Sequence, residues 1–188
     1  AGIYLSYSGL KTAAVPFAEQ QAGALLTARL DIAAAVLNSG LNSDLELARR
    51  LAERPELREM LAGGQADAKA LARLQGAGPA ASGILAGLDL ADPKGLVTAS
   101  VKTEGSGADL SRRADFRLGT KKYYISGPRL SGKDIGYDVT VPVFPAAGSA
   151  SRPIGALRCR FKAAPAQLAA LDALRAEGAA LVLAKRGG

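Results

Sequence analysis

The first part of the chain has apolar residues at helical spacing. From Thr12 to about Asn38 they recur at steps of three and four residues, which places them on one face of an α-helix. They are Ala22, Leu26, Leu30, Ala33 and Leu37. A helix of about 26 residues would be ~39 Å long. Pro16 either kinks this helix or lies in its first turn, and Asn38-Ser39-Gly40 predicts its end.

Three shorter helices are predicted next. Ser43-Asp44-Leu45-Glu46 has the pattern of a capping box, in which the Ser hydroxyl and the Glu carboxylate satisfy exposed backbone donors, and it starts a helix that runs toward Arg54. Pro55, in a first-turn position, starts a second one that ends at Gly63-Gly64. The third extends from Asp67 to Leu74.

The main boundary within the chain is Gly76-Ala77-Gly78-Pro79, where helical spacing stops and strand composition begins. After it, apolar runs joined by short connections predict an antiparallel sheet. Asp92-Pro93-Lys94-Gly95 has the residues of a β-turn between the first two strands. The predicted strands are 84–90, 96–101, 123–126, 138–144 and 154–161.

Two segments outside the predicted strands differ in character. Residues 102–122 are polar and rich in Gly and Arg, and predict a long loop with at most one helical turn. Pro165 to about Glu177 has Leu168, Leu171 and Leu174 at three-residue steps and predicts a helix. Its extension through Leu181 and Val182 fits either more helix or a strand of a further domain.

Composition argues against catalysis. The 188 residues include one Cys and no His, so a Ser-His-Asp or Cys-His relay has no base and a zinc site lacks its usual ligands. An imine at Lys121 or Lys122 has no supporting signature, and Gly105-Ser106-Gly107 lacks the Lys and Ser/Thr of a phosphate-binding loop. We therefore expect no catalytic residues, no metal and no cofactor.

Charge is unevenly distributed. Residues 1–99 carry 9 basic and 10 acidic side chains and residues 100–188 carry 15 and 7, which add up to 24 and 17 and a net charge of +7. An anionic partner is therefore expected in the second half. Nucleic acid is not expected as a partner, because acidic residues interrupt the basic ones and no aromatic-basic ribonucleoprotein motif is present.

The densest polar stretches are residues 109–117 and 121–129. The guanidinium of an arginine can bind a carboxylate through two parallel hydrogen bonds, and Tyr and Ser hydroxyls can complete the coordination of the carboxylate. The alternative is a set of solvated loop charges paired with nearby aspartates. Strand alternation places Tyr124 and Ser126 on one face and Tyr123 and Ile125 on the other. Tyr137 either supplies a second hydroxyl to the same cavity or is a tyrosine at the edge of the core.

Several sequence segments, in this order, resemble the Cache family of extracytoplasmic PAS-like sensor domains of bacterial receptors. They are 87–100 (GLDLADPKGLVTAS), 107–117 (GADLSRRADFR), 124–128 (YISGP), 141–144 (VPVF) and 154–157 (IGAL). The resemblance covers roughly residues 80–162. Arg113-Ala-Asp-Phe116 replaces the family's commoner Arg-Pro-Tyr-Phe, and the turn over 148–153 is longer and richer in Ser and Arg than usual.

The resemblance implies an α+β fold with a PAS-like (Cache) central antiparallel sheet, a long N-terminal helix and short helices. The whole chain, 1–188, would be a single extracytoplasmic sensor domain. Its helical part would be 1–78, its sheet 79–162, and 163–188 a C-terminal helix or the start of a truncated segment. A ligand cavity would lie on one face of the sheet, under the loop around Arg113.

The implied function is that of a periplasmic sensor domain of a membrane-anchored receptor, foremost a methyl-accepting chemotaxis receptor, that binds a small organic anion such as an acetate-like carboxylate. The alternatives are a histidine kinase or cyclic-dinucleotide enzyme whose sensor binds an amino acid, a cytosolic PAS-like module and a nucleic-acid-binding domain. Ligand residues implied by the family are Arg113, Tyr124, Ser126 and Tyr137, with Lys122 and Arg129 as further candidates.

The membrane anchor is expected outside this sequence. No run of 18 apolar residues occurs, while Ile3, Tyr4, Leu5 and Tyr7 fit the fringe of a membrane helix, where tyrosine prefers the interface. A long helix in a tethered receptor also pairs readily with its twin, so a homodimer through the N-terminal helix is expected.

Overall fold

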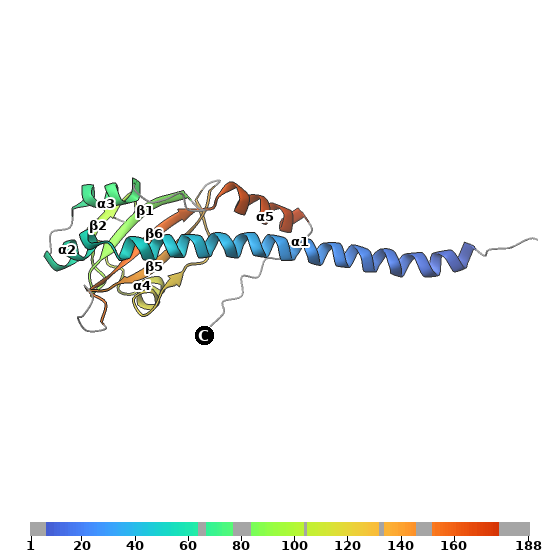
Figure 1. Cartoon of the computed structure of the whole chain (residues 1–188), viewed down its shortest axis with the longest axis horizontal. Coiled ribbons are helices and arrows are strands. Elements are labelled where there is room, and N and C mark those ends of the chain that lie inside the picture. Colours follow the sequence, from blue (N-terminus) through green and yellow to red (C-terminus); the bar gives the residue numbers. More distant parts are fainter. Residues whose placement is uncertain are drawn as a thin grey trace, which may run out of the picture.

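The computed structural model describes residues 7–63, 67–76, 84–103, 105–131, 134–145 and 152–176. A long first helix runs along the molecule and extends well beyond the sheet (Figure 1). In chain order, the elements are α1 (Tyr7–Ala52), α2 (Pro55–Gly63), α3 (Ala68–Gly76), β1 (Ile84–Ala91), β2 (Val97–Val101), α4 (Ala114–Gly119), β3 (Tyr124–Ile125), β4 (Arg129–Ser131), β5 (Asp134–Val143), β6 (Gly155–Lys162) and α5 (Pro165–Ala176).

The six strands form one antiparallel sheet in the order β2-β1-β6-β5-β3, and β4 also pairs with β5. Strands β3 and β4 lie end to end along the same edge of β5, since Tyr124 pairs with Thr140 and Arg129 with Gly136. Helices and an antiparallel sheet in one chain confirm the expected α+β class.

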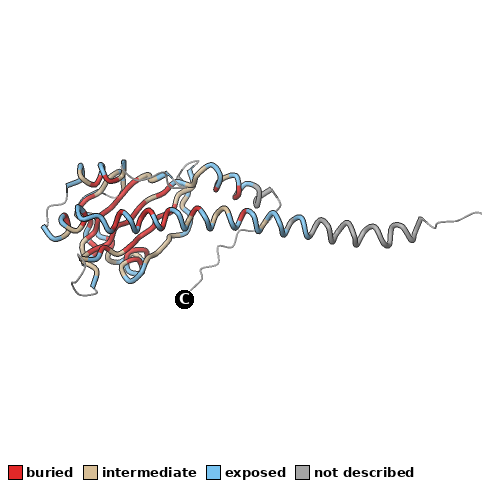
Figure 2. Tube along the Cα trace, in the orientation of Figure 1, coloured by how far each residue is buried: buried red, intermediate tan, exposed pale blue. Residues whose placement is uncertain are grey.

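The hydrophobic core lies on one face of the sheet, under α1, α2 and α3. Alternate residues of the central strands, Val139 of β5 and Leu157 and Phe161 of β6 among them, pack there against Leu51 and Leu57. Figure 2 shows that burial is concentrated in the sheet and in the part of α1 that lies over it. We call the side of the sheet under these helices the helix face. The intervening residues of the strands point to the opposite side, which we call the charged face.

The predicted break at Asn38-Ser39-Gly40 is wrong, because α1 continues through it to Ala52. Gly40 is not a helix end but the point where α5 approaches α1. A Cβ on Gly40 would overlap the side-chain amide of Gln167 in α5. Asp44 of the expected capping box is likewise inside the helix, and it is fully buried. Tertiary packing has thus overridden a local stop signal.

Most of the other elements agree with the pattern of the sequence. Helices α2, α3 and α5, strands β1, β2, β3 and β6, and the turn at 92–95 are confirmed. In that turn, Asp92 Oδ1 accepts hydrogen bonds from the backbone N–H groups of Lys94 and Leu96, both at 2.9 Å.

Two strands differ from the prediction. Strand β5 starts at Asp134, four residues early, because the unpredicted β4 pairs with its first residues. Two other predicted features, the boundary at 77–79 and the extension beyond Glu177, fall on residues outside the described ranges.

The helical turn expected within 102–122 is α4, which lies on the charged face. Gly119 lets this helix approach the sheet closely, since a Cβ there would lie 2.6 Å from Cβ of Thr140 in β5. Within the described ranges, no helix is both long and apolar enough to span a bilayer.

Candidate functional site

The charged face carries a small apolar cluster that includes Phe116 of α4 and Ala156 of β6. Beside it, charged and hydroxyl side chains line the sheet where a sheet covered on both sides would carry apolar ones. The strand register makes Asp89 of β1 and Thr140 of β5 cross-strand neighbours of Arg158 in β6, and Asp138 of β5 the neighbour of Arg160. Opposite charges on adjacent strands therefore meet directly.

Arg158 is the buried centre of this face. Its Nε donates to Oδ2 of Asp89 at 2.9 Å, and its Nη2 donates to the same oxygen. Ser100 Oγ, at 2.7 Å, and Thr103 Oγ1 donate to the other Asp89 oxygen. The carboxylate is therefore fixed from β2 and the turn after it, and it fixes the guanidinium in turn. Nη1 of Arg158 lies 3.7 Å from Oδ2 of Asp115.

Asp138 is the carboxylate on which the arginines converge, and it is 0% exposed. Arg129 Nη2 donates to its Oδ1, and Arg160 Nε lies 3.4 Å from the same oxygen. Its Oδ2 lies 3.9 Å from Nη2 of Arg113 and 3.9 Å from Nη1 of Arg158. Among the described residues no hydrogen bond to this second oxygen is formed, although a buried carboxylate oxygen normally accepts one.

Arg113 reaches the charged face from the start of α4. It has an extended backbone at the N-cap position, and its Nε and Nη2 donate to the two oxygens of Asp115 at 3.2 and 3.0 Å. Asp115 Oδ1 also accepts from the backbone N–H of Phe116 at 2.9 Å. This bidentate geometry fixes the plane of the guanidinium, while 37% of the Arg113 side chain stays exposed.

These residues form what we call the arginine–aspartate cluster. Its members are Arg113, Arg129, Arg158, Arg160, Asp89, Asp115 and Asp138. Four guanidiniums against three carboxylates give the cluster a charge of +1. Two of the four arginine side chains are more than a third exposed to solvent, Arg113 at 37% and Arg129 at 41%. The cluster can therefore attract a monoanion, and the partly dry surroundings strengthen that attraction.

The structure brings four of the six predicted site residues to this face. Arg113 and Arg129 belong to the cluster. Ser126 Oγ accepts from the backbone N–H of Asp138 at 2.8 Å. Tyr124 pairs with Thr140, which places it on the same face. The alternation predicted for 123–126 is thus observed, since Tyr123 and Ile125 pack against the core of the helix face.

Tyr137 and Lys122 lie elsewhere. The Tyr137 ring packs in the core of the helix face, stacked on Phe161 at 5.8 Å between ring centroids, and its hydroxyl donates to Asp44 of α1. A shared cavity with Tyr124 is therefore wrong for Tyr137, and burial together with the hydrogen bond to Asp44 raises its pKa. Lys122 Nζ lies over the ring of Tyr123, 5.6 Å from its centroid, and contacts none of the cluster in the described structure.

The sequence reasoning missed the cluster residues that lie on the strands β1, β5 and β6. Asp89, Arg158 and Arg160 occur inside predicted strands, at alternate positions among apolar residues. A charged residue at a strand position that should be buried is a detectable signal, because such a group is retained only when it is paired. Metal binding has no comparable support, since no group of three or more metal-ligating side chains occurs in the described part of the chain.

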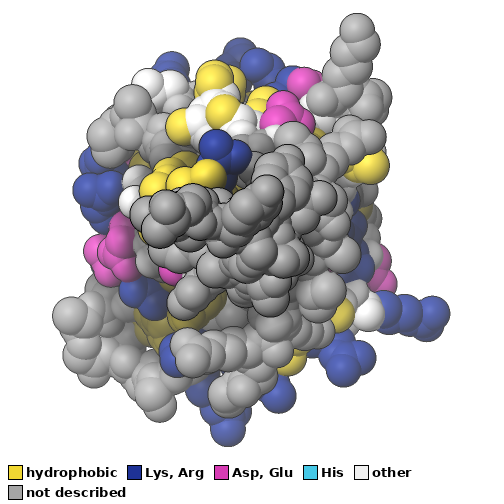
Figure 3. Space-filling model, turned by 90° about the vertical axis from the view of Figure 1, so that its right-hand side faces the viewer, with side chains coloured by type: hydrophobic (Ala, Val, Ile, Leu, Met, Phe, Trp, Pro, Cys, Tyr) yellow, Lys and Arg dark blue, Asp and Glu magenta, His cyan; other side chains and the backbone are white. Residues whose placement is uncertain are grey.

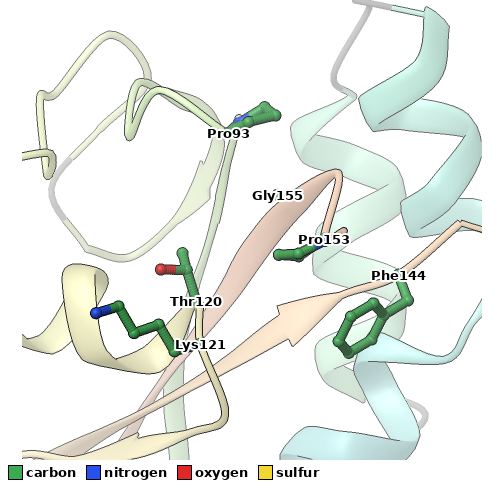
Figure 4. A pocket seen from close by; sticks show the side chains of 6 residues that line it. All are labelled: Pro93, Thr120, Lys121, Phe144, Pro153 and Gly155. Carbon is green, nitrogen blue, oxygen red and sulfur yellow. The ribbon is translucent and has the colours of Figure 1, made fainter. Parts of the chain in front are cut away.

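A separate hollow of about 420 Å³ lies beside the end of α4 (Figure 4). Its lining residues are Pro93, Thr120, Lys121, Phe144, Pro153 and Gly155. They offer one cation and apolar surface but no carboxylate, so the hollow suits an anion and not a zwitterion. Figure 3 shows basic side chains around the rim of the end-on view with acidic ones among them, not one basic patch.

Comparison with solved structures assigns the fold. No protein-family model matches the chain, and the search of curated proteins finds no significant match. The ligand-binding domain of the amino acid chemoreceptor PctC of Pseudomonas aeruginosa PAO1, in complex with GABA, is similar with a TM-score of 0.57 and 20% identity over 86% of this chain and 68% of that one.

Two further structures are more distant. The ligand-binding domain of the chemoreceptor PctB of the same organism, in complex with L-Arg, has a TM-score of 0.50 and 16% identity over 73% of this chain and 56% of that one. A methyl-accepting chemotaxis protein X has a TM-score of 0.40 and 18% identity over 86% and 65%. The fold is that of chemoreceptor ligand-binding domains, which confirms the Cache-like fold expected from the sequence.

Proposed function

We propose that this chain is the ligand-binding sensor domain of a bacterial membrane receptor and that it binds a small carboxylate on the charged face. The observation that carries the proposal is the arginine–aspartate cluster, with its charge of +1 and with Arg113 and Arg129 partly open to solvent. Guanidinium groups bind carboxylates bidentately. Tyr124 and Ser126 lie on the same face, beside the cluster.

The size of the ligand limits its affinity. Acetate has four heavy atoms, and a ceiling of about −1.5 kcal/mol per atom gives about −6 kcal/mol, or tens of micromolar at best. Sensing at that level suits a receptor for an environmental metabolite. A ligand with more heavy atoms on the same cluster has a higher ceiling on its affinity.

An amino acid is the second candidate, and Asp138 favours it over acetate. Its second carboxylate oxygen accepts no hydrogen bond within the described structure, and an ammonium group would supply the missing donor. An amino acid would then place its carboxylate on the arginines and its ammonium group on Asp138. The PctC and PctB domains, in complex with GABA and L-Arg, have the same fold and bind ligands of this type.

Within such a receptor the domain would face the periplasm, carry no catalytic activity and transmit the binding event through its terminal helices. The chemoreceptors with this fold support a chemotaxis receptor over a histidine kinase or a cyclic-dinucleotide enzyme. A ligand can shift a receptor only by the difference between its affinities for the two states. The proposal therefore needs a ligand-dependent contact between the charged face and the helices.

The direct test is binding by the chain and by Arg113→Ala. Thermal shift and calorimetry with acetate, γ-aminobutyrate and the standard amino acids should identify a ligand. Its affinity should fall roughly 10- to 100-fold in Arg113→Ala, as expected for the loss of a charge-assisted contact. The stability should change by at most about 1 kcal/mol, since the Arg113 pair is partly exposed.

Lys121→Ala is the matched control, because it removes the cation of the hollow and leaves the cluster intact. The ligand should bind this variant with the same affinity as the unchanged chain. If Lys121→Ala abolishes binding while Arg113→Ala binds normally, the site is the hollow. Melting temperatures raised only by amines or polyols would contradict an anion site altogether.

A second copy of the chain is the other partner we propose, with α1 as the contact. Leu25 and Ile32, seven residues apart on this helix, are 58% and 65% exposed, the spacing of a coiled-coil seam. Sedimentation should show a monomer–dimer equilibrium, which Ile32→Asp shifts to monomer. Asp31→Asn, a change at the neighbouring exposed position, should leave the equilibrium as it is. Monomer alone at high concentration would contradict the dimer.

A further inference from the structure

A buried polar contact joins three elements on the helix face of the sheet. The hydroxyl of Tyr137 in β5 donates to Oδ2 of Asp44 in α1 and accepts from Nε2 of Gln167 in α5 at 3.3 Å. All three side chains are buried. We infer that this Tyr137 contact couples the charged face to the helices α1 and α5. The inference rests on the proposed function only in taking the charged face as the ligand site.

The position of α5 depends on this contact. Gln167 uses both ends of its amide, since Oε1 accepts from the backbone N–H of Ala164 at 2.7 Å while Nε2 reaches Tyr137. Gly40 leaves the space for that amide against α1. Among the described side chains, the apolar part of the α1–α5 interface is a cluster around Ala33 and Ala170. The buried hydrogen bond from Gln167 to Tyr137 adds a directional contact to this apolar one.

Tyr137 is adjacent in sequence to Asp138, the carboxylate on which the arginines converge. Successive residues of a strand point to opposite faces, so the site and the Tyr137 contact share one stretch of β5 backbone. That stretch is also tied to the neighbouring edge, because Ser126 Oγ accepts from the backbone N–H of Asp138 and Ser126 N donates to its carbonyl, both at 2.8 Å. A movement of Asp138 therefore moves the Tyr137 backbone with it.

The coupling requires two arrangements of the contact, of which the structure shows the one in which it is made. In that arrangement α5 is docked on α1 and the Asp44 carboxylate accepts the hydrogen bond from Tyr137. In the other arrangement this hydrogen bond is lost and α5 moves away from α1. A ligand that takes Arg113 or Arg129 from Asp138 changes the forces on β5 and shifts the balance between the two arrangements.

Hydrogen exchange of the α5 amides tests the coupling without any ligand. Arg129→Gln removes one ion pair from Asp138 and should make α5 exchange about fivefold faster in the full chain. In a Tyr137→Phe background α5 should already exchange fast, and adding Arg129→Gln should have no further effect. Lys162→Gln is the control, because it breaks the exposed ion pair between Lys162 of β6 and Asp134 of β5. It should leave the hydrogen exchange of α5 unchanged.

Two results would overturn the inference. One is unchanged exchange of α5 in Arg129→Gln, and the other is an additive effect of the two substitutions in the double variant. If Tyr137→Phe fails to fold, Gln167→Ala breaks only the α5 side of the contact and serves as the background instead. Because these comparisons contain no ligand, they are separate from the proposed function. Failure to bind acetate, γ-aminobutyrate or any amino acid would contradict that proposal and leave the coupling standing.

Discussion

Arg158→Met should lower the free energy of unfolding by about 3–5 kcal/mol, the cost of removing one partner of a buried ion pair. Arg158 supplies two hydrogen bonds to Asp89, and it lies within 4 Å of the carboxylates of Asp115 and Asp138. Methionine fills much of the space but leaves these buried negative charges without their shared cation. Urea denaturation followed by circular dichroism measures the loss.

The control is Lys162→Met, on the same strand. Lys162 pairs with Asp134 at 2.7 Å, but both side chains are about half exposed, so the loss should stay within about 1 kcal/mol. Adding Asp89→Asn to Arg158→Met should restore part of the stability, because it removes one of the unpaired charges. A loss below 1 kcal/mol in Arg158→Met would mean that water already screens the cluster.

Asp138→Asn should reverse the ligand preference of the site. The substitution leaves four guanidiniums against two carboxylates and raises the charge of the cluster from +1 to +2, so acetate should bind about tenfold more tightly, a gain of about 1.4 kcal/mol. γ-Aminobutyrate should bind at least about tenfold more weakly, because its ammonium group loses an ionic partner. Calorimetry at low ionic strength, where charge effects are largest, gives both values.

Asp134→Asn is the matched control for this pair of measurements, since Asp134 lies on the same strand but is exposed and contacts Lys162. It should leave both affinities unchanged. A parallel fall of both affinities in Asp138→Asn would assign Asp138 a structural role. Unchanged affinities would place the ligand away from the cluster.

Alternation along the sequence predicts which residues of one strand share a face, but it does not predict the register between strands. Alternation within 123–126 was enough to separate Tyr124 from Tyr123. Tyr137 lies on another strand, and only the pairing of Tyr124 with Thr140 shows that odd-numbered residues of β5 point to the helix face. Register depends on contacts between distant parts of the chain, so the role of Tyr137 was not available from local pattern.

The same limit explains two other differences between prediction and structure. Gly40 is a helix stop by local preference, and its actual use, close approach of α5, depends on Gln167 more than a hundred residues later. Asp89 and Arg158 are 69 residues apart and meet only once β1 and β6 pair. Arg113 lies in a local motif of the sequence, whereas the buried charges that surround it do not.

Because α1 is long, a small tilt of the helix displaces its far end by a large distance. Between Asp44, where the helix is bonded to the sheet, and Tyr7, at its first described turn, the axis measures about 55 Å at 1.5 Å per residue. A tilt of about 1° around Asp44 would then carry the Tyr7 end sideways by about 1 Å. A rearrangement at the sheet that is too small to alter its hydrogen bonds would thus displace the Tyr7 end of α1 by about 1 Å. Neighbouring helices at subunit interfaces shift by a similar distance, about 1–2 Å.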